Sequence, residues 1–174
     1  GVTGVQTCAL PISQVVAKGP DGLMLAIIEP HKPPSFALPE YDALSRAFNS
    51  TQMVRSLDTA LAFYCGVLGW KVLVREEVRD REEPGADVLG LPMPAARGWL
   101  RRVAIVHPEG VNDGSVELIE IGSVEGRDFS ARAVAPHVGL LALRVAVPAA
   151  RAYAAEIVAR GAMLYTEPAT IEIA

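Results

Sequence analysis

The chain has 174 residues, of which 51% are hydrophobic and 21% are charged, so it can bury a sizeable core and is not expected to be disordered. Its net charge of -4 and its scattered Lys and Arg residues create no basic field for a phosphate backbone, which argues against nucleic acid as a partner. No apolar run approaches the roughly 20 residues that span a bilayer, and the first residues lack the order of a secretory signal. These features predict a cytoplasmic protein without a membrane partner. The two cysteines, Cys8 and Cys65, provide neither a disulfide framework nor metal-ligand spacing.

The first twelve residues differ in character from the rest of the chain. Residues 2–12, with the sequence VTGVQTCALPI, have neither helical nor strand periodicity, and they resemble the conceptual translation of a sequencing-library adaptor. We therefore expect residues 1–12 to be non-native and the natural chain to begin further upstream.

A hairpin is predicted over residues 13–29. Two apolar runs, QVVAK and LMLAIIE, flank Gly-Pro-Asp-Gly, in which proline presets its φ and glycine accepts a positive φ. A lone hairpin is marginally stable in water, so these strands should belong to a larger sheet. The proline-rich residues 30–41 are typical of a linker.

The segment from Val54 to Trp70 predicts a helix between two strands. Ser56 is a suitable N-cap, and Asp58 places a carboxylate in the first turn, where the helix dipole favours it. Apolar residues recur at helical spacing, and Gly69 permits the left-handed residue that ends a helix. These apolar positions, which should form one buried face, are Leu57, Leu61, Tyr64 and Leu68.

Four strands are predicted around this helix. They cover residues 47–54, 70–77, 99–107 and 115–121, the last two joined by an Asn-Asp-Gly turn. The order is therefore β-α-β-β-β over residues 42–122. Residues 123–136 are a second linker, after which the pattern restarts over 137–174 with a strand at 140–147, a helix from 148 to 160 ended by Gly161, and a strand at 162–168. The sequence ends before this copy is complete, so we expect truncation at this end too. We also expect open sheet edges near the hairpin and after Thr166.

The repeated unit, opened by V-x-S-L-D-x-A-L-A-F-Y and closed by L-G-W, resembles the vicinal oxygen chelate superfamily of glyoxalases, bleomycin-resistance proteins and extradiol dioxygenases. GPDG followed by LMLAIIE resembles the last hairpin of such a module, and GSVELIEIG resembles its fourth strand. The resemblance covers nearly all of residues 13–174. It implies an α+β fold in which β-α-β-β-β modules form curved mixed sheets around a cavity.

The resemblance also implies where ligands would lie. Family members commonly bind a divalent metal (Fe, Mn, Zn or Ni) through the first and fourth strands of paired modules. In this chain those positions fall on Asn49 and Glu117, which are the candidate metal ligands, and Glu117 is the candidate catalytic residue. Strand alternation places Glu117 with Ile119 and Ile121, where an apolar environment calls for a metal, a hydrogen-bond partner or a proton. Glu120 lies on the opposite face, so alternation alone does not choose between the two carboxylates.

Several positions argue against a complete metal site. Leu140 occupies the first-strand position of the partner module, and Ala26 occupies the fourth-strand position of the upstream one. His107 and His137 could contribute only in a different register, and for them, as for His31, a surface or capping role is the simpler interpretation. Asn49 is a weak donor for transition metals.

Three functions follow. One is an enzyme, a glyoxalase-type lyase or an extradiol dioxygenase, that binds a small oxygen-bearing substrate with a divalent metal. Another is a metal-free binding protein of the bleomycin-resistance type that holds a ligand against apolar residues such as Trp99 or Tyr64. The third is a non-catalytic module pair that supports another. Pairing of modules could also produce a homo-oligomer.

Overall fold

The structure is a computed structural model that describes residues 12–32, 40, 42–79, 100–122, 125–139 and 142–170. The predicted N-terminal hairpin is confirmed. Strand β1 (Ile12–Lys18) pairs antiparallel with β2 (Met24–Pro30) through a short 3-10 turn, Pro20–Gly22. Both Asp21 (φ 56°) and Gly22 (φ 78°) adopt the left-handed conformation there, which Asp tolerates and Gly adopts without steric cost.

The hairpin forms a sheet of its own. Among the described strands, β1 and β2 pair only with each other, as expected for strands whose neighbours lie elsewhere. Strand β1 begins at Ile12, one residue inside the segment predicted to be non-native, and residues 1–11 lie outside the described part of the chain.

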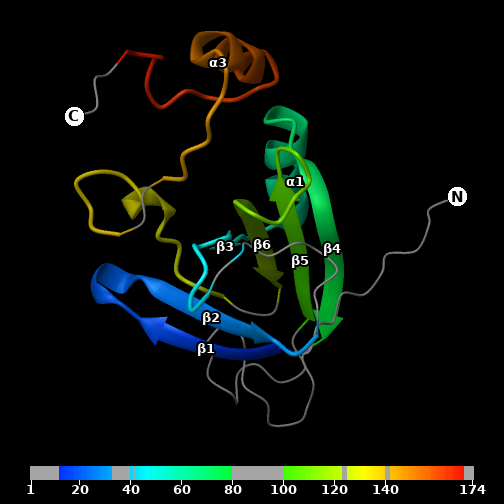
Figure 1. Cartoon of the computed structure of the whole chain (residues 1–174). Coiled ribbons are helices and arrows are strands. Elements are labelled where there is room, and N and C mark those ends of the chain that lie inside the picture. The colour runs from blue at the N-terminus through cyan, green and yellow to red at the C-terminus, as the bar shows by residue number, and fades with distance from the viewer. Residues whose placement is uncertain are drawn as a thin grey trace, which may run out of the picture.

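The second sheet has four strands in the order β3-β6-β5-β4 (Figure 1). The strands are β3 (Asn49–Met53), β4 (Lys71–Arg79), β5 (Leu100–His107) and β6 (Ser115–Ile121). The first and last of these pair in parallel, whereas β5 is antiparallel to both of its neighbours. The predicted β-α-β-β-β order over residues 47–121 is therefore observed, and the first strand lies beside the fourth.

The helix that connects β3 to β4 begins as predicted. Helix α1 (Leu57–Leu61) continues into one π-helical segment, η2 (Ala62–Val67). The Ser56 hydroxyl accepts a hydrogen bond from the Thr59 N–H at 3.2 Å, and the segment ends before Gly69, whose φ is 76°.

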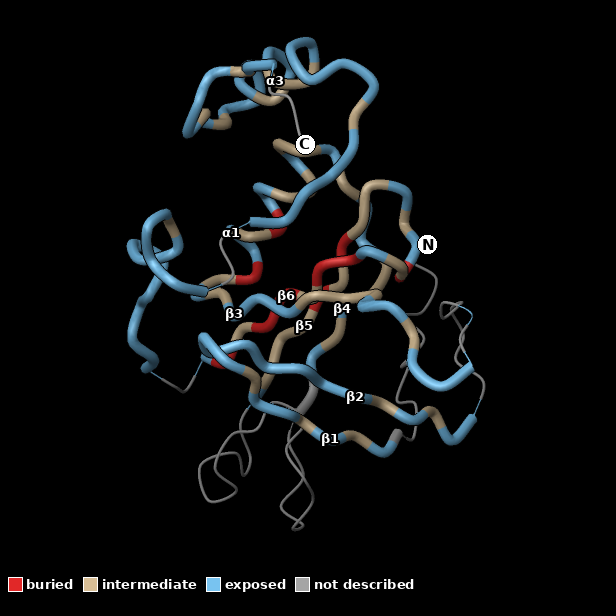
Figure 2. The backbone as a smooth tube through the Cα atoms, turned by 60° about the vertical axis from the view of Figure 1, so that its left-hand side comes forward, coloured by how far each residue is buried: buried red, intermediate tan, exposed pale blue. Residues whose placement is uncertain are grey.

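The core lies between α1 and one face of the four-stranded sheet. Leu57 and Leu61 pack from the helix onto inward-facing residues of β5 and β6. Figure 2 shows buried backbone segments in α1 and in the sheet beside it. The sheet residues in this cluster are Ala104, Val106, Val116 and Leu118, each with at most 1% of its surface exposed. Tyr64 and Leu68, the other two positions of the predicted apolar stripe, are half-buried.

The C-terminal segment keeps its helix but not its strands. Helix α3 (Ala150–Ala159) lies within the predicted range, and Gly161 follows it with a φ of 101°. The strands predicted at 140–147 and 162–168 are wrong for the residues that the structure describes, because 142–147 and 162–168 have no ladder. An extended segment becomes a strand only where a neighbour accepts and donates its backbone hydrogen bonds.

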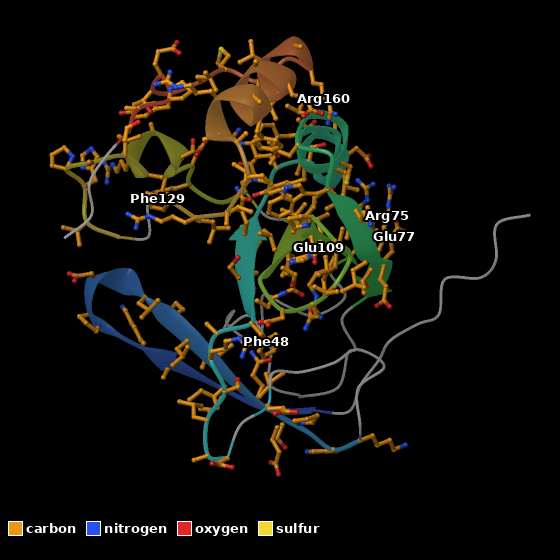
Figure 3. The ribbon with its side chains drawn as sticks, turned by 45° about the horizontal axis from the view of Figure 1, so that its top comes forward. Phe48, Arg75, Glu77, Glu109, Phe129 and Arg160 are labelled. Atoms are coloured by element: carbon orange, nitrogen blue, oxygen red, sulfur yellow. The ribbon has the colours of Figure 1, made fainter. Side chains whose placement is uncertain are left out.

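Helix α3 lies against the end of η2. The Tyr153 hydroxyl donates a hydrogen bond to the Leu68 carbonyl at 3.1 Å, and a guanidinium N–H of Arg160 donates to the Val67 carbonyl at 3.5 Å. Figure 3 labels Arg160 beside that end. Carbonyls at a helix end have no intrahelical partner, so these two side chains satisfy them. A further 3-10 turn, η3 (Ser130–Arg132), interrupts the predicted second linker. No helix in the described ranges is long and apolar enough to cross a membrane.

Candidate functional site

The two faces of the four-stranded sheet have different roles. One face carries α1. On the other, here called the helix-free face, β3 contributes Asn49 and Thr51, while β6 contributes Ser115, Glu117 and Ile119. This division follows from the alternation of side chains along a strand and from the parallel register that sets Thr51 opposite Glu117.

Glu117 is the central polar residue of the helix-free face. Its carboxylate accepts a hydrogen bond from the Thr51 hydroxyl at 3.0 Å. Burial raises the pKa of Glu117 above its usual value, and the Thr51 hydrogen bond and the positive charge of Arg101 oppose part of that rise. The sequence placed Glu117 among Ile119 and Ile121, and both isoleucines are buried. Glu117 is therefore a carboxyl group that can hold a proton at a higher pH than an exposed one.

Asn49 belongs to a polar chain beside Glu117. Its amide Nδ2 donates to the Ser115 hydroxyl at 3.0 Å, and that hydroxyl donates to the Asn112 side-chain oxygen at 3.1 Å. Asn112 and Ser115 are 4% and 1% exposed, so this chain satisfies polar groups that would otherwise be costly to bury. Asn49 and Glu117 lie diagonally on adjacent strands, because their direct partners are Ser115 and Thr51.

Glu120, the alternative carboxylate, lies on the helix side of the sheet. Its Oε2 accepts a hydrogen bond from the Leu57 N–H at 2.6 Å and another from Arg102 at 3.1 Å. Arg102 also binds Asp58, at 2.9 Å, and so joins the sheet to the first turn of α1. Glu120 thus anchors the helix N-terminus, where an anionic group is favourable. The sequence predicted opposite faces for the two carboxylates, and the structure shows that Glu120 is the one on the helix side.

The three histidines lie at turns or at the surface. The Nδ1 atom of His107 accepts hydrogen bonds from the Glu109 and Val111 N–H groups, at 3.0 and 3.3 Å, and so shapes the turn after β5. His31 lies on the hairpin, with Nε2 2.7 Å from the Ser13 hydroxyl oxygen. His137 is exposed in the segment after η3. Each has the surface or capping role that the sequence favoured.

The donor set around Glu117 does not fit a complete metal site within the described residues. No three His, Cys, Asp or Glu side chains converge there or elsewhere in the described ranges. Glu117 and Asn49 would supply one carboxylate and one neutral amide, whereas a catalytic metal commonly has three protein ligands. Both are also engaged, with Thr51 and Ser115.

Other positions singled out in the sequence lie elsewhere. Ala26 is exposed on β2. Leu140 and Trp99 lie outside the described residues. Tyr64 packs on the helix side, where its hydroxyl donates to the Gln52 side-chain oxygen at 2.9 Å and its ring contacts Phe63 and Trp70. Tyr64 and Glu117 therefore lie on opposite faces of the sheet.

The sequence missed Thr51 and Arg101 as neighbours of Glu117. Thr51 was visible only as one member of an unusually polar strand, and its pairing with Glu117 depends on the register between two strands far apart in the chain. Arg101 lies on β5 opposite Ile121, the residue that follows Glu120 on β6. Neither neighbour could be identified without that register.

The comparisons with known proteins agree with the fold. The family model of the Glyoxalase/Bleomycin resistance protein/Dioxygenase superfamily matches residues 47–170, which include the whole four-stranded sheet and helix α3. No significant match was found among the curated proteins or among the solved structures. The family match covers more than half of the chain, and the β-α-β-β-β unit lies inside it. The chain therefore belongs to the Glyoxalase/Bleomycin resistance protein/Dioxygenase superfamily, the vicinal oxygen chelate proteins.

Proposed function

We propose that the helix-free face binds a small oxygen-bearing molecule and that Glu117 is its main polar contact. The observation that supports this most is the half-buried carboxyl group of Glu117, which has a raised pKa and stands among buried isoleucines. The Thr51 hydroxyl donates a hydrogen bond to this carboxylate at 3.0 Å, and the positive charge of Arg101 acts on it as well.

The chemistry of this carboxyl group suits an oxygen-bearing ligand. When it is protonated, Glu117 can donate a hydrogen bond to a carbonyl or hydroxyl oxygen. When it is ionised, it can accept one from a ligand hydroxyl. A raised pKa brings both forms closer to neutral pH, which is also what a general acid or base requires. Thr51, which already donates a hydrogen bond to this carboxylate, would orient it toward the ligand.

The metal-free binding mode agrees best with the side chains present. Glu117 and Asn49 could supply two metal ligands, whereas a catalytic metal commonly has three from the protein. Lyase or dioxygenase chemistry and a role for Asn49 as a metal ligand stay predictions from the family resemblance.

Calorimetry with two matched probes tests the proposal. Catechol carries two neighbouring oxygens, and toluene has a similar ring without oxygen. We expect catechol to bind the unmodified chain more tightly than toluene does, and Glu117→Ala to weaken catechol binding by roughly tenfold to a hundredfold with little change for toluene, since a hydrogen bond to a charged group is worth about 1.5–3 kcal/mol.

Glu77→Ala is the matched control, because Glu77 is an exposed carboxylate of the helix side on β4. Its substitution should leave both affinities unchanged. Equal catechol affinity in Glu117→Ala and the unmodified chain, with the fold retained by circular dichroism, would refute the proposed role of Glu117.

A further inference from the structure

A positively charged residue shares the helix-free face with Glu117 and comes from the neighbouring strand. Strand β5 pairs with β6 so that Arg101 is opposite Ile121, and directly opposite residues of paired strands share a face. Ile121 follows Glu117 and Ile119 at every second position of β6, so its side chain lies on the helix-free face. Arg101 therefore places a guanidinium group on the same face as the Glu117 carboxyl group.

The next residue of β5 shows that this placement is specific. Arg102 lies on the other face of the sheet, where its guanidinium binds Asp58 at 2.9 Å and Glu120 at 3.1 Å. The two arginines are thus divided between the faces. Arg102 connects the sheet to α1, and Arg101 brings its charge to the face that contains Glu117.

The positive charge of Arg101 acts on the Glu117 carboxyl group. It lowers the pKa of Glu117, although burial raises that pKa by more, so that the net direction is upward. Such an electrostatic effect extends over the space between the two side chains, where the effective dielectric constant is lower than in water. The same guanidinium would therefore attract an anion bound beside Glu117.

The spacing along the strands leaves room for a small molecule between the two side chains. Glu117 is opposite Ile105 and Arg101 is opposite Ile121, so the two positions are four residues apart along the sheet. At about 3.3 Å per residue, their backbone positions are roughly 13 Å apart along the strand direction. Both side chains are long, so a ligand with one ring and two polar substituents can contact both. Val103 lies between them on β5 and is only half-buried.

Arg101 lies between two carboxylates of the helix-free face. On β4, Glu76 is opposite Val103, so it shares this face from the other side of β5. A guanidinium group has five N–H donors and can bind several carboxylates together. Arg102 demonstrates this in the same strand, because it contacts three carboxylates within 3.5 Å. Contacts that Arg101 makes within the protein are therefore compatible with a ligand carboxylate.

The protonated form of Glu117 suits an anionic ligand. Two ionised carboxylates side by side repel each other, whereas a protonated carboxyl group donates a hydrogen bond to an oxygen of its neighbour. Burial already favours the protonated form of Glu117. The pair of Glu117 and Arg101 therefore offers one neutral donor and one cationic donor.

We propose that the ligand of the helix-free face is a small carboxylate with a neighbouring hydroxyl or carbonyl oxygen. Arg101 binds the carboxylate through charge-assisted hydrogen bonds, and Glu117 contacts the neighbouring oxygen. Arg101 is then the residue that selects anions over neutral molecules of the same shape. This inference rests on the proposed function and names the chemical class of its ligand.

Calorimetry with a charged probe and its neutral counterpart tests the inference. Salicylate is an anion at neutral pH, and salicylamide has nearly the same shape without the charge. We expect the full chain to bind salicylate roughly tenfold to a hundredfold more tightly than salicylamide, since hydrogen bonds between charged groups are the stronger ones. Arg101→Gln should weaken salicylate binding by a similar factor and leave salicylamide binding nearly unchanged, so that the preference disappears.

Two further variants serve as controls. Arg101→Lys keeps the positive charge, so it should retain more of the preference for salicylate than Arg101→Gln does. Arg75 is an exposed arginine of the helix side on β4, opposite the buried Ala104, and is labelled in Figure 3. Arg75→Gln should leave both affinities unchanged. Circular dichroism checks that each variant is folded.

Glu117→Ala separates this inference from the proposed function. Both probes carry the hydroxyl group, so this variant should weaken the binding of both. If it does so, but the unmodified chain binds the two probes equally or Arg101→Gln keeps the preference, Arg101 does not select anions. The inference is then overturned while the proposed function stands. If Glu117→Ala changes neither affinity, the proposed function fails, and this inference fails with it.

Discussion

At the residue scale, Glu117 shows which parts of a side chain's environment the sequence predicts and which parts depend on the fold. Alternation along SVELIEI predicted its apolar neighbours, and the structure buries both Ile119 and Ile121. The hydrogen bond from Thr51 required the register of β3 against β6, which depends on tertiary pairing across 66 residues. The carboxylate and its apolar neighbours were therefore predictable, whereas its hydrogen-bond donor was not.

The raised pKa of Glu117 predicts a pH dependence of stability. Between the usual carboxyl pKa and the raised one, the folded chain binds more protons than the unfolded chain, so its free energy of unfolding falls as pH rises through that window. Glu117→Gln should remove this fall and be the more stable form above the window.

Urea denaturation at a series of pH values measures this difference. Glu109→Gln, at an exposed turn position, is the control and should follow the unmodified chain. Parallel curves for Glu117→Gln and the unmodified chain would contradict the raised pKa.

At the scale of elements, local sequence patterns predicted the helices correctly, and they predicted strands correctly only where a neighbouring strand pairs with them. Ser56, Asp58 and Gly69 predicted the start and end of the helix, and the helix is present between them. The same kind of pattern predicted strands at 140–147 and 162–168, and these are absent from the described residues because extended backbone needs a hydrogen-bonded partner. A helix satisfies its backbone internally, so α3 forms where its flanking strands do not.

Glu120 connects α1 to the sheet, and its removal should cost more than the loss of a surface charge. Glu120→Ala takes away an acceptor for the Leu57 N–H and for Arg102, so we expect a loss of about 1.5–3 kcal/mol in the free energy of unfolding. Glu77→Ala, which loses an exposed ion pair at 3.5 Å with Arg102, should cost less than about 1 kcal/mol.

Chemical denaturation of both variants measures the comparison. Equal losses would show that the helix anchor contributes no more than a surface pair does.

At the scale of the whole molecule, the described residues contain one β-α-β-β-β unit, a separate hairpin and the C-terminal helix α3. The family and the α+β class could be predicted from the segment around Leu57 and from the predicted repeat near Ala150, and the family match over 47–170 confirms the family. The arrangement of the hairpin and α3 could not be predicted, because their contacts depend on which segments meet in space. Alternation predicted that Glu117 and Glu120 lie on opposite faces, but only the assembled fold shows which of them lies beneath α1.

We propose that Glu117 presents a protonatable carboxyl group to a small oxygen-bearing ligand. The most direct measurement is a pH titration of the Glu117 side-chain carbon by NMR, with and without saturating catechol. We expect a carboxyl pKa above its usual value in the free chain and a further change in that titration when catechol binds. A carboxyl group that titrates at its ordinary value and does not respond to catechol would show that Glu117 does not have this role.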